Sequence, residues 1–390
     1  MEINDSWVRQ NSFTFLRLLL AMTVVIGHAS ALGGFAGDPI ARWTYGRASL
    51  GSLAVCGFFA LSGFLLTHSW TVSPALDRFF LHRFFRIMPA FWASLLVTVF
   101  VLAPLILMTQ IGEAPGYWES LATGPNSALD YLCHNWLLTL QQFGICTLFA
   151  ANPHPFAVNG SLWTLAYEGL CYLCLMLAAV SGWLRRRHFT LALFLFVYGT
   201  RIIDIHLVTS LREMAPVTMQ CIPILNDPTG LPLYLAFLSG MVCYQYRMLL
   251  PWRLPWLIGA SFFAVVVTAF GYVELAWPPT LAFILLYFGR ILPFQRWEKL
   301  GDFSYGIYIY AFPIQQCLAL ADVQCYGRAA FTIASLASSV IAGLLSWHLL
   351  EKHAIGWGRS IARRLRTGAL KSGEGIGTKI LPPIHRQVSS

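Results

Sequence analysis

The sequence predicts an all-α protein, a polytopic membrane helix bundle with about ten transmembrane helices. Hydrophobic residues make up 57% of the chain and charged residues 11%, whereas an average soluble domain has about 25% charged residues. The apolar residues form separate runs of roughly 20 residues, long enough for a helix to cross a hydrocarbon core about 30 Å thick. Transmembrane β-strands would alternate apolar and polar residues instead, so the runs favour helices.

Ten apolar runs, bounded by charges, Gly or Pro, are expected to be the spans. In chain order they cover residues 13–33, 50–69, 88–109, 161–181, 189–207, 230–247, 254–272, 277–293, 302–320 and 328–350. The first run is full length and follows Glu2 and Asp5, unlike a cleaved signal peptide, so we expect it to stay in the protein. Residues 1–355 are interpreted as one transmembrane domain, and residues 356–390 as a basic, disordered cytoplasmic tail.

The distribution of Lys and Arg predicts the orientation of the spans. Alternate connections are basic, at residues 70–87, 182–188, 248–253 and 294–301, as is the segment after Glu351. The other connections carry eight acidic residues against four arginines, with Arg328 at the edge of the last run counted, which places them outside and both termini in the cytoplasm. The net charge of +9 then reflects topology and attraction to membrane lipids, so no nucleic-acid partner is expected. The long external connection, 110–160, has an amphipathic stretch from Tyr131 to Phe149 that could lie in the interface or re-enter the membrane and cover a site.

Arg17 and His28 are the first candidate functional residues, because ionisable groups inside a membrane span are costly and usually functional. They stand eleven positions apart in the first run. On a helix, eleven residues return to within about 20° of the same direction and rise roughly 16 Å. The two side chains are therefore expected to line one stripe that leads into the bilayer. The alternative is an Arg that reaches the interface and a buried, hydrogen-bonded His.

No metal or redox site is predicted. The sequence has neither an HExxH motif nor a paired CxxC array, which are the usual signs of zinc. Cys171 and Cys174 lack a second pair and are interpreted as small apolar residues. Four of the nine cysteines map to the external side, where a disulfide is possible and the partners stay open: Cys133, Cys146, Cys221 and Cys325.

A series of motifs, spread from residue 11 to about Glu351, resembles one known family. The motifs are Asn11–Arg17 with His28, Gly57–Leu65, Arg83-Phe-Phe-Arg86-Ile-Met-Pro89, Ser161-Leu-Trp-Thr-Leu-Ala-Tyr-Glu168 and Gly301–Tyr308. In this order they look like those of the acyltransferase-3 family, bacterial membrane acyltransferases that move acyl groups onto extracytoplasmic glycans and related acceptors. The resemblance implies a multi-pass O-acyltransferase of the bacterial cytoplasmic (inner) membrane, similar to O-acetyltransferases of surface polysaccharides.

His28 is the expected catalytic residue. Acyl transfer to a hydroxyl needs a base that takes the hydroxyl proton, or a nucleophile that carries the acyl group, and an imidazole can do either. Glu168 is the candidate partner, because a buried carboxylate can fix the tautomer of His28 and stabilise its protonated form. Both are expected in the outer third of the membrane. Gly169 stands where the family often has a second acid, so Glu168 is the acid available in that motif.

The expected donor is acetyl-CoA or another cytosolic acyl-CoA, used as a co-substrate. Arg83 and Arg86 lie three residues apart, so they share one helix face at the cytoplasmic mouth of the third span, suited to bidentate contacts with phosphates. Arg17, near the same membrane face, could meet the phosphates or the pantetheine arm. The alternative for Arg83 and Arg86 is a pair of topological anchors.

The expected acceptor is an extracytoplasmic glycan or a lipid-linked saccharide, with Asn159, Ser161 and Trp163 shaping its side of the site. A second class of function stays open. Arg17, His28 and Glu168 could instead line the substrate or proton pathway of a transporter, because buried ionisable groups mark such pathways too. The two halves of the chain show no obvious repeat, and this favours the enzyme.

Overall fold

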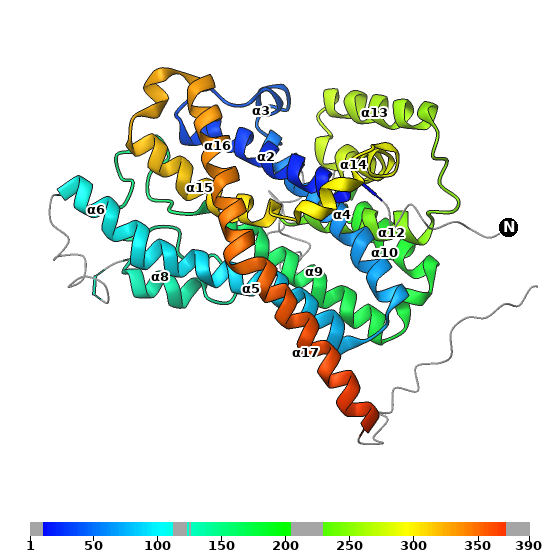
Figure 1. Ribbon diagram of the computed structural model, residues 1–390. Helices are drawn as coiled ribbons and strands as arrows, with labels where there is room; N and C mark the ends of the chain where they lie inside the picture. The colour runs from blue at the N-terminus through cyan, green and yellow to red at the C-terminus, as the bar shows by residue number, and fades with distance from the viewer. Residues whose placement is uncertain (1–10, 112–122, 125, 204–228, 372–390) are drawn as a thin grey trace, which may run out of the picture.

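The computed structural model describes residues 11–111, 123–124, 126–203 and 229–371, and all the regular structure in those residues is helical (Figure 1). The all-α prediction is confirmed there. Each predicted run overlaps a helix: α2 Phe13–Leu32, α4 Leu50–Val72, α5 Leu76–Val97, α9 Trp163–Val180, α10 Arg187–Ile203, α12 Leu231–Gln245, α13 Leu254–Ala269, α14 Val273–Ile291, α15 Ser304–Leu320 and α16 Arg328–Ser346.

Helix α4 is the centre of the bundle and packs against α2, α12 and α14. Its closest neighbour is α12, where glycines let the two backbones meet. A Cβ atom on Gly240 would lie 2.0 Å from the carbonyl oxygen of Ala60, and one on Gly63 would lie 2.0 Å from that of Phe237. Small residues at helix crossings in membrane proteins permit this close approach, so the glycines set the spacing of α4 and α12.

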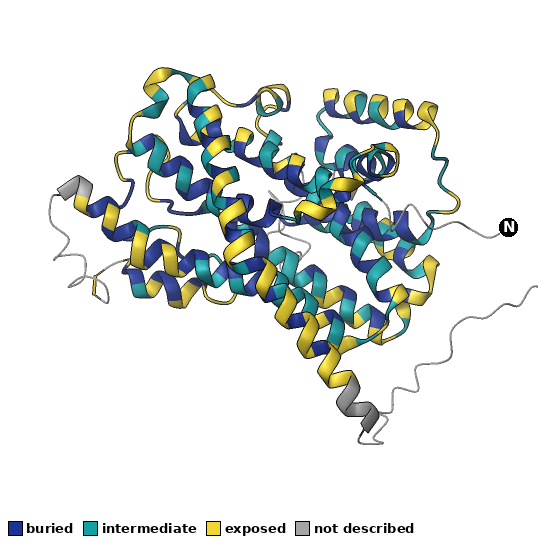
Figure 2. Ribbon diagram, in the orientation of Figure 1, coloured by how far each residue is buried: buried dark blue, intermediate teal, exposed yellow. Residues whose placement is uncertain are grey.

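Helix α2 lies between α4 on one side and α15 and α16 on the other. A Cβ atom on Gly27 would lie 2.5 Å from the backbone nitrogen of Gly51, so α2 and α4 also cross closely. Figure 2 shows buried residues where these helices meet and exposed residues on their outer faces. The first span is therefore an interior helix, and both of its ionisable residues lie among other helices.

Helix α5, the third predicted span, starts earlier than the sequence predicts, at Leu76 and not at residue 88. Only Ser73–Ala75 connect α4 to α5, which starts at Leu76 and continues through a π-helical segment, Thr98–Leu102, into α6, Ala103–Ile111. The expected cytoplasmic loop, 70–87, is therefore mostly helix. Hydropathy misses its first turns because arginines alternate with aromatic residues there, and the aromatic side pairs with the bundle, as Phe79 does with Trp70 at 5.7 Å between rings.

The predicted tail is helical over much of its length. Helix α16 continues through the π-helical segment Trp347–Glu351 into α17, Lys352–Lys371, while residues 372–390 lie outside the described part. Ala354, Gly358 and Ala362 are spaced four apart and buried, and α17 packs on α5. A Cβ atom on Gly358 would lie 2.8 Å from the Phe85 side chain. This face of small residues packs the first turns of α17, up to Ala362, on the bundle.

The stretch Tyr131–Phe149 packs on protein. Helix α8, Ala128–Asn135, precedes a loop whose Phe149 is fully buried, as is Tyr131 in α8. The Trp92 side chain of α5 donates a hydrogen bond to the Trp136 carbonyl, at 3.0 Å, and the two rings stack 5.0 Å apart. The described part of the long connection is thus folded back on α5.

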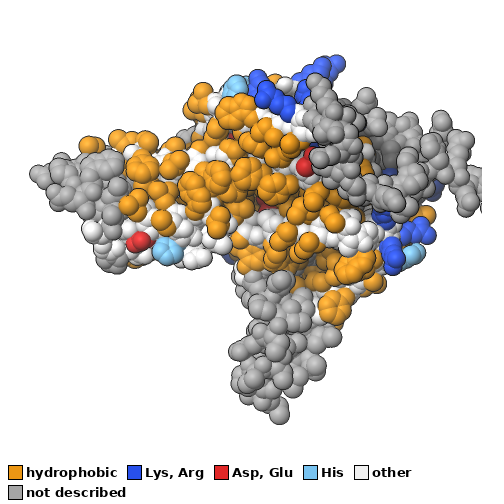
Figure 3. Space-filling model, turned by 90° about the horizontal axis from the view of Figure 1, so that it is seen from below, with side chains coloured by type: hydrophobic (Ala, Val, Ile, Leu, Met, Phe, Trp, Pro, Cys, Tyr) orange, Lys and Arg blue, Asp and Glu red, His pale blue; other side chains and the backbone are white. Residues whose placement is uncertain are grey.

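The exposed surface is that of a membrane protein. Five helical segments among the described residues are long and apolar enough to cross a bilayer: Phe13–Leu32, Leu50–Val72, Leu76–Met108, Gly160–Val180 and Arg328–Arg366. Two shorter apolar helices are α12 and α13. Hydrophobic side chains cover much of the face seen in Figure 3. The ten-span topology with cytoplasmic termini stays a prediction.

The α4–α12 crossing gives a stability test with a matched control. Gly240→Ala is expected to lower the free energy of unfolding by about 1–3 kcal/mol, the usual cost of overpacking, because its methyl group would collide with the α4 backbone. In Gly259→Ala, on α13, the methyl group meets no atom within 4 Å, so this variant should be as stable as the wild type or more. Thermal unfolding of both variants in detergent measures the difference, and equal midpoints would contradict the assigned crossing.

Candidate active site

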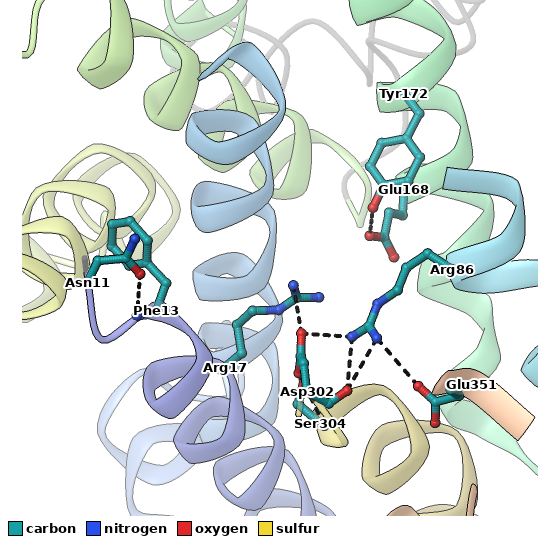
Figure 4. A network of polar contacts seen from close by, with 9 residues as sticks. All are labelled: Asn11, Phe13, Arg17, Arg86, Glu168, Tyr172, Asp302, Ser304 and Glu351. Carbon is teal, nitrogen blue, oxygen red and sulfur yellow. Dashed lines mark hydrogen bonds and ion pairs between the residues drawn. The ribbon is translucent and has the colours of Figure 1, made fainter. Parts of the chain in front are cut away.

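Asp302 joins two of the predicted arginines. It lies in the loop between η5, Gln295–Leu300, and α15. Its carboxylate is 2.9 Å from Arg17 Nη1 and 2.8 Å from Arg86 Nη2 (Figure 4), and it accepts a hydrogen bond from Ser304. Asp302 therefore bridges α2 and α5 through ion pairs with both arginines.

Arg86 is held by a second carboxylate. Its Nη1 lies 3.6 Å from Glu351 Oε2, and Glu351 is 1% exposed and accepts a hydrogen bond of 2.8 Å from Ser346. The guanidinium also donates to the Asp302 carbonyl and lies 5.9 Å from the centre of the Tyr305 ring. Arg86 thus connects α5, the loop before α15 and the start of α17.

A polar cavity of about 60 Å³ opens beside this network. Four of the predicted site residues line it: Arg17, Arg83, Arg86 and Glu168. Glu168 accepts a hydrogen bond from the Tyr172 hydroxyl, one turn along α9 (Figure 4). The Arg83 side chain makes no hydrogen bond or ion pair with any described residue. Arg83 is therefore the cavity cation that remains free for an anionic ligand.

His28 lies in a second cluster around Phe312. Its ring meets the Phe312 ring edge-on, with centroids 5.6 Å apart, and the exposed His154 meets it at 5.9 Å. The His28 Nδ1 atom is buried and has no hydrogen-bond partner in the described chain. A Cβ atom on Gly160 would lie 2.7 Å from the Phe312 ring, so the Asn159–Ser161 segment borders the same ring as His28.

The predicted acceptor residues separate into two environments. Asn159 donates to the Ile309 carbonyl at 2.8 Å, and its side-chain oxygen is buried without a partner, as is the Ser161 hydroxyl, within the described residues. Both border α15 close to Phe312. Trp163 instead packs on Tyr167, with ring centres 5.4 Å apart, and it does not line the polar cavity.

The expected hydrogen bond between His28 and Glu168 is not formed in this structure. Glu168 lies seven residues beyond Ser161 in the chain, which is about 10 Å of helix, and it faces the cavity of Arg17 and Arg83. Between the two clusters, the Tyr308 hydroxyl is 2.5 Å from Thr164 Oγ1 and donates to the Ser161 carbonyl at 2.8 Å. The pairing of His28 with Glu168 therefore stays a prediction.

Polar residues of α15 fix the outer cluster. Gln315 donates to the Val25 carbonyl at 2.9 Å, one turn before His28. Gln316 donates to the His154 carbonyl at 2.8 Å and accepts a hydrogen bond from the Asn152 side chain. These bonds secure the end of the 126–160 segment beside His28, which agrees with a loop that covers a site.

Sequence reasoning missed four residues of this arrangement, namely Asp302, Glu351, Tyr172 and Tyr308. Asp302 and Tyr308 lie within the Gly301–Tyr308 motif, to which the sequence assigns no site residue, and Glu351 only marks the end of the motif series. A usable signal was present, because Asp302 and Glu351 are acidic residues at the edges of predicted spans, where an ionisable group needs an oppositely charged partner. Which acid pairs with which arginine depends on tertiary packing.

Known proteins resemble this chain over nearly its whole length. A family model described as an acyltransferase domain matches residues 10–348. A protein of Shigella phage Sf6 named O-acetyl transferase is 25% identical over 362 residues, 88% of this chain and 96% of the relative. Nodulation protein 10 of Rhizobium leguminosarum bv. viciae is 27% identical over 382 residues, 91% of this chain and 96% of the relative. No solved structure matches the chain.

The ion network predicts different effects for the two arginines of α5. Arg86→Ala is expected to cost about 3–5 kcal/mol of stability, as breaking a buried ion pair from one side does, because Glu351 would keep a buried charge. Arg83→Ala, three residues away on α5, removes no ion pair and should cost much less. Thermal unfolding in detergent compares them. Partial recovery by Glu351→Gln in the Arg86→Ala background is expected, and equal losses in the two single variants would contradict the assignment.

Proposed function

Since this chain belongs to the acyltransferase family whose model covers residues 10–348, we propose that it is a membrane O-acyltransferase acting on a glycan. It moves an acetyl or other short acyl group from cytosolic acyl-CoA to a hydroxyl of an extracytoplasmic polysaccharide or lipid-linked saccharide. The phage relative named O-acetyl transferase supports acetyl as the group transferred. The protein resides as a multi-pass protein in the bacterial cytoplasmic membrane, with both termini in the cytoplasm.

The observation that carries this proposal is that two clusters lie at opposite ends of α2. Arg17 lines a cationic cavity at one end of the helix. At the other end His28 borders the Phe312 ring, which the Asn159–Ser161 segment with its buried polar atoms also borders. A cationic cavity suits a phosphate-bearing donor, and an imidazole among unpaired polar groups suits a hydroxyl acceptor. The two substrates would therefore approach from opposite ends of one helix.

His28 performs the chemistry in this proposal. As a base it takes the proton of the acceptor hydroxyl while the oxygen attacks the thioester carbonyl. The carbon–sulfur bond then breaks, and the proton passes to the coenzyme A thiolate. In the covalent alternative, the imidazole nitrogen attacks the thioester carbonyl, the carbon–sulfur bond breaks and coenzyme A leaves as the thiolate. The acceptor hydroxyl then attacks the acyl group, the carbon–nitrogen bond breaks, and the hydroxyl proton passes to the thiolate. Both routes end with the same ester and free coenzyme A.

The donor contacts are assigned to Arg83 and Arg17. Arg83 faces the cavity without an ion-pair partner among the described residues, whereas both carboxylates around Arg86 already neutralise its charge. We assign Arg86 to holding Asp302, which in turn orients Arg17. Glu168, with Tyr172 on it, supplies the negative charge of the cavity and orients Arg83. The thioester must pass the Tyr308–Thr164 contact to reach His28.

Loss of the imidazole tests the reaction. His28→Ala is expected to reduce acyl transfer by at least about 10²–10⁴-fold, the usual contribution of acid–base catalysis, because the acceptor hydroxyl would lose its base. The measurement is mass analysis of surface glycans, together with abundance and unfolding of the variant in membranes. His353→Ala, an exposed residue of α17, is the matched control and should keep wild-type transfer. Full glycan acylation by His28→Ala would sink the mechanism.

Donor binding separates the enzyme from the transporter alternative, because only the enzyme needs a coenzyme A site. Arg83→Ala is expected to weaken acetyl-CoA binding to purified protein by about 1.5–3 kcal/mol, the worth of a hydrogen bond to a charged group. Arg83→Lys should recover part of it, because Lys keeps the charge and loses the planar fork.

The control for this measurement is Arg253→Ala, an exposed cytoplasmic-side charge at the start of α13, which should bind acetyl-CoA like the wild type. Binding measured by calorimetry in nanodiscs should also weaken as salt is raised. Wild-type protein that binds no coenzyme A, or equal losses in Arg83→Ala and Arg253→Ala, would move the interpretation to the transporter.

A further inference from the structure

A second, apolar cavity lies on another face of α9. It has a volume of about 300 Å³ and lies between α9, α10 and α12. Its wall includes Cys174, Ala178, Leu193, Val197 and Phe237, and no charged residue of the described chain lines it. An apolar cavity of about 150 Å³ already accepts a molecule of benzene, so this one has room for a segment of hydrocarbon chain.

A basic surface continues from one end of this cavity. It is lined by Arg185, Arg186, Arg187 and His188 at the α9–α10 connection, and Phe189 lines both the basic surface and the apolar cavity. Gln245 donates to the Leu184 carbonyl at 2.7 Å, which fixes the end of α12 beneath it. No acidic side chain among the described residues lines either part.

Two of these arginines have no partner of their own. Arg187 lies 5.9 Å from the centre of the Tyr246 ring, and the Tyr246 hydroxyl is 3.3 Å from His188 Nδ1. Arg185 and Arg186 are exposed, and their side chains form no hydrogen bond or ion pair within the described chain. Adjacent guanidinium groups without carboxylates suit a phosphate group. Topological anchoring explains the charges but not the apolar cavity that adjoins them.

We propose that the two parts form one binding site for an anionic glycerophospholipid of the cytoplasmic leaflet. The lipid phosphate binds Arg185 and Arg186, and an acyl chain enters the cavity between α9, α10 and α12. Basic pockets between membrane helices on the cytoplasmic side are where anionic headgroups bind. The proposal is independent of acyl transfer, because the acyl-transfer cavity lies on another face of α9, where Glu168 and Tyr172 point. A bound lipid would nevertheless stabilise α9, the helix that carries Glu168 and Tyr172.

Lipid binding to the purified full-length protein tests this site. Native mass spectrometry with phosphatidylglycerol and phosphatidylcholine at equal concentrations should show one phosphatidylglycerol bound at least tenfold more tightly. Arg185→Gln with Arg186→Gln should bind the two lipids equally, because the phosphate contacts are lost. Ala178→Phe should lose the tight phosphatidylglycerol, because the ring fills the chain cavity while leaving every charge in place.

Matched controls are Arg253→Gln, an exposed Arg at the start of α13, and Ala260→Phe, a half-buried alanine within α13, and both should bind like the wild type. Arg185→Lys with Arg186→Lys keeps the charge and should retain part of the preference even if the Gln variant fails to fold. Equal binding of both lipids by the wild type, or unchanged binding by Ala178→Phe, would overturn the site and leave only nonspecific boundary lipid. Displacement of phosphatidylglycerol by an isoprenyl phosphate at tenfold lower concentration would also overturn it, since the occupant would then be a carrier lipid.

Discussion

The charged cavity depends on Asp302 and the two arginines that it holds. Charges inside a bilayer are stable only when they are paired and hydrogen-bonded. Asp302 satisfies that requirement for Arg17 of α2 and Arg86 of α5 at once, and Arg86 extends it to Glu351. Four segments that are far apart in the sequence are thereby joined at one level of the bundle. Arg83 can remain free because its neighbours neutralise one another.

Helix α15 connects this network to the cluster around His28 within about one turn. Tyr308 lines the cavity and contacts Thr164, while Phe312, four residues on, packs against His28. Further along, Gln315 and Gln316 fix α2 and the external segment. Helix α15 thus carries Tyr308, which lies between the two clusters, and the two glutamines that hold the outer cluster in place.

The sequence was sufficient for the helical fold because run length and composition are local properties. The gathering of Arg17, Arg83 and Arg86 follows from the motif positions, whereas Glu168 is expected beside His28 and lines the cavity of the arginines instead. The pairing of charges does not follow from them, because Asp302 and Glu351 reach Arg86 only through tertiary packing. Amphipathic helices were also missed. The start of α5 and the first part of α17 mix basic and apolar residues. Their mean hydropathy is therefore that of a loop, although one face of each helix is buried.

Because α2 is anchored at two points, it fixes the distance between Arg17 and His28. Arg17 is held by Asp302, and the Val25 carbonyl by Gln315, so the helix can neither slide nor turn between them. The distance and the angle between the two side chains then depend on the number of residues that separate them along the helix. One residue inserted between them would turn His28 by about 100° and move it about 1.5 Å, away from Phe312. Substitutions along α2 can be absorbed by repacking, whereas a change in its length cannot.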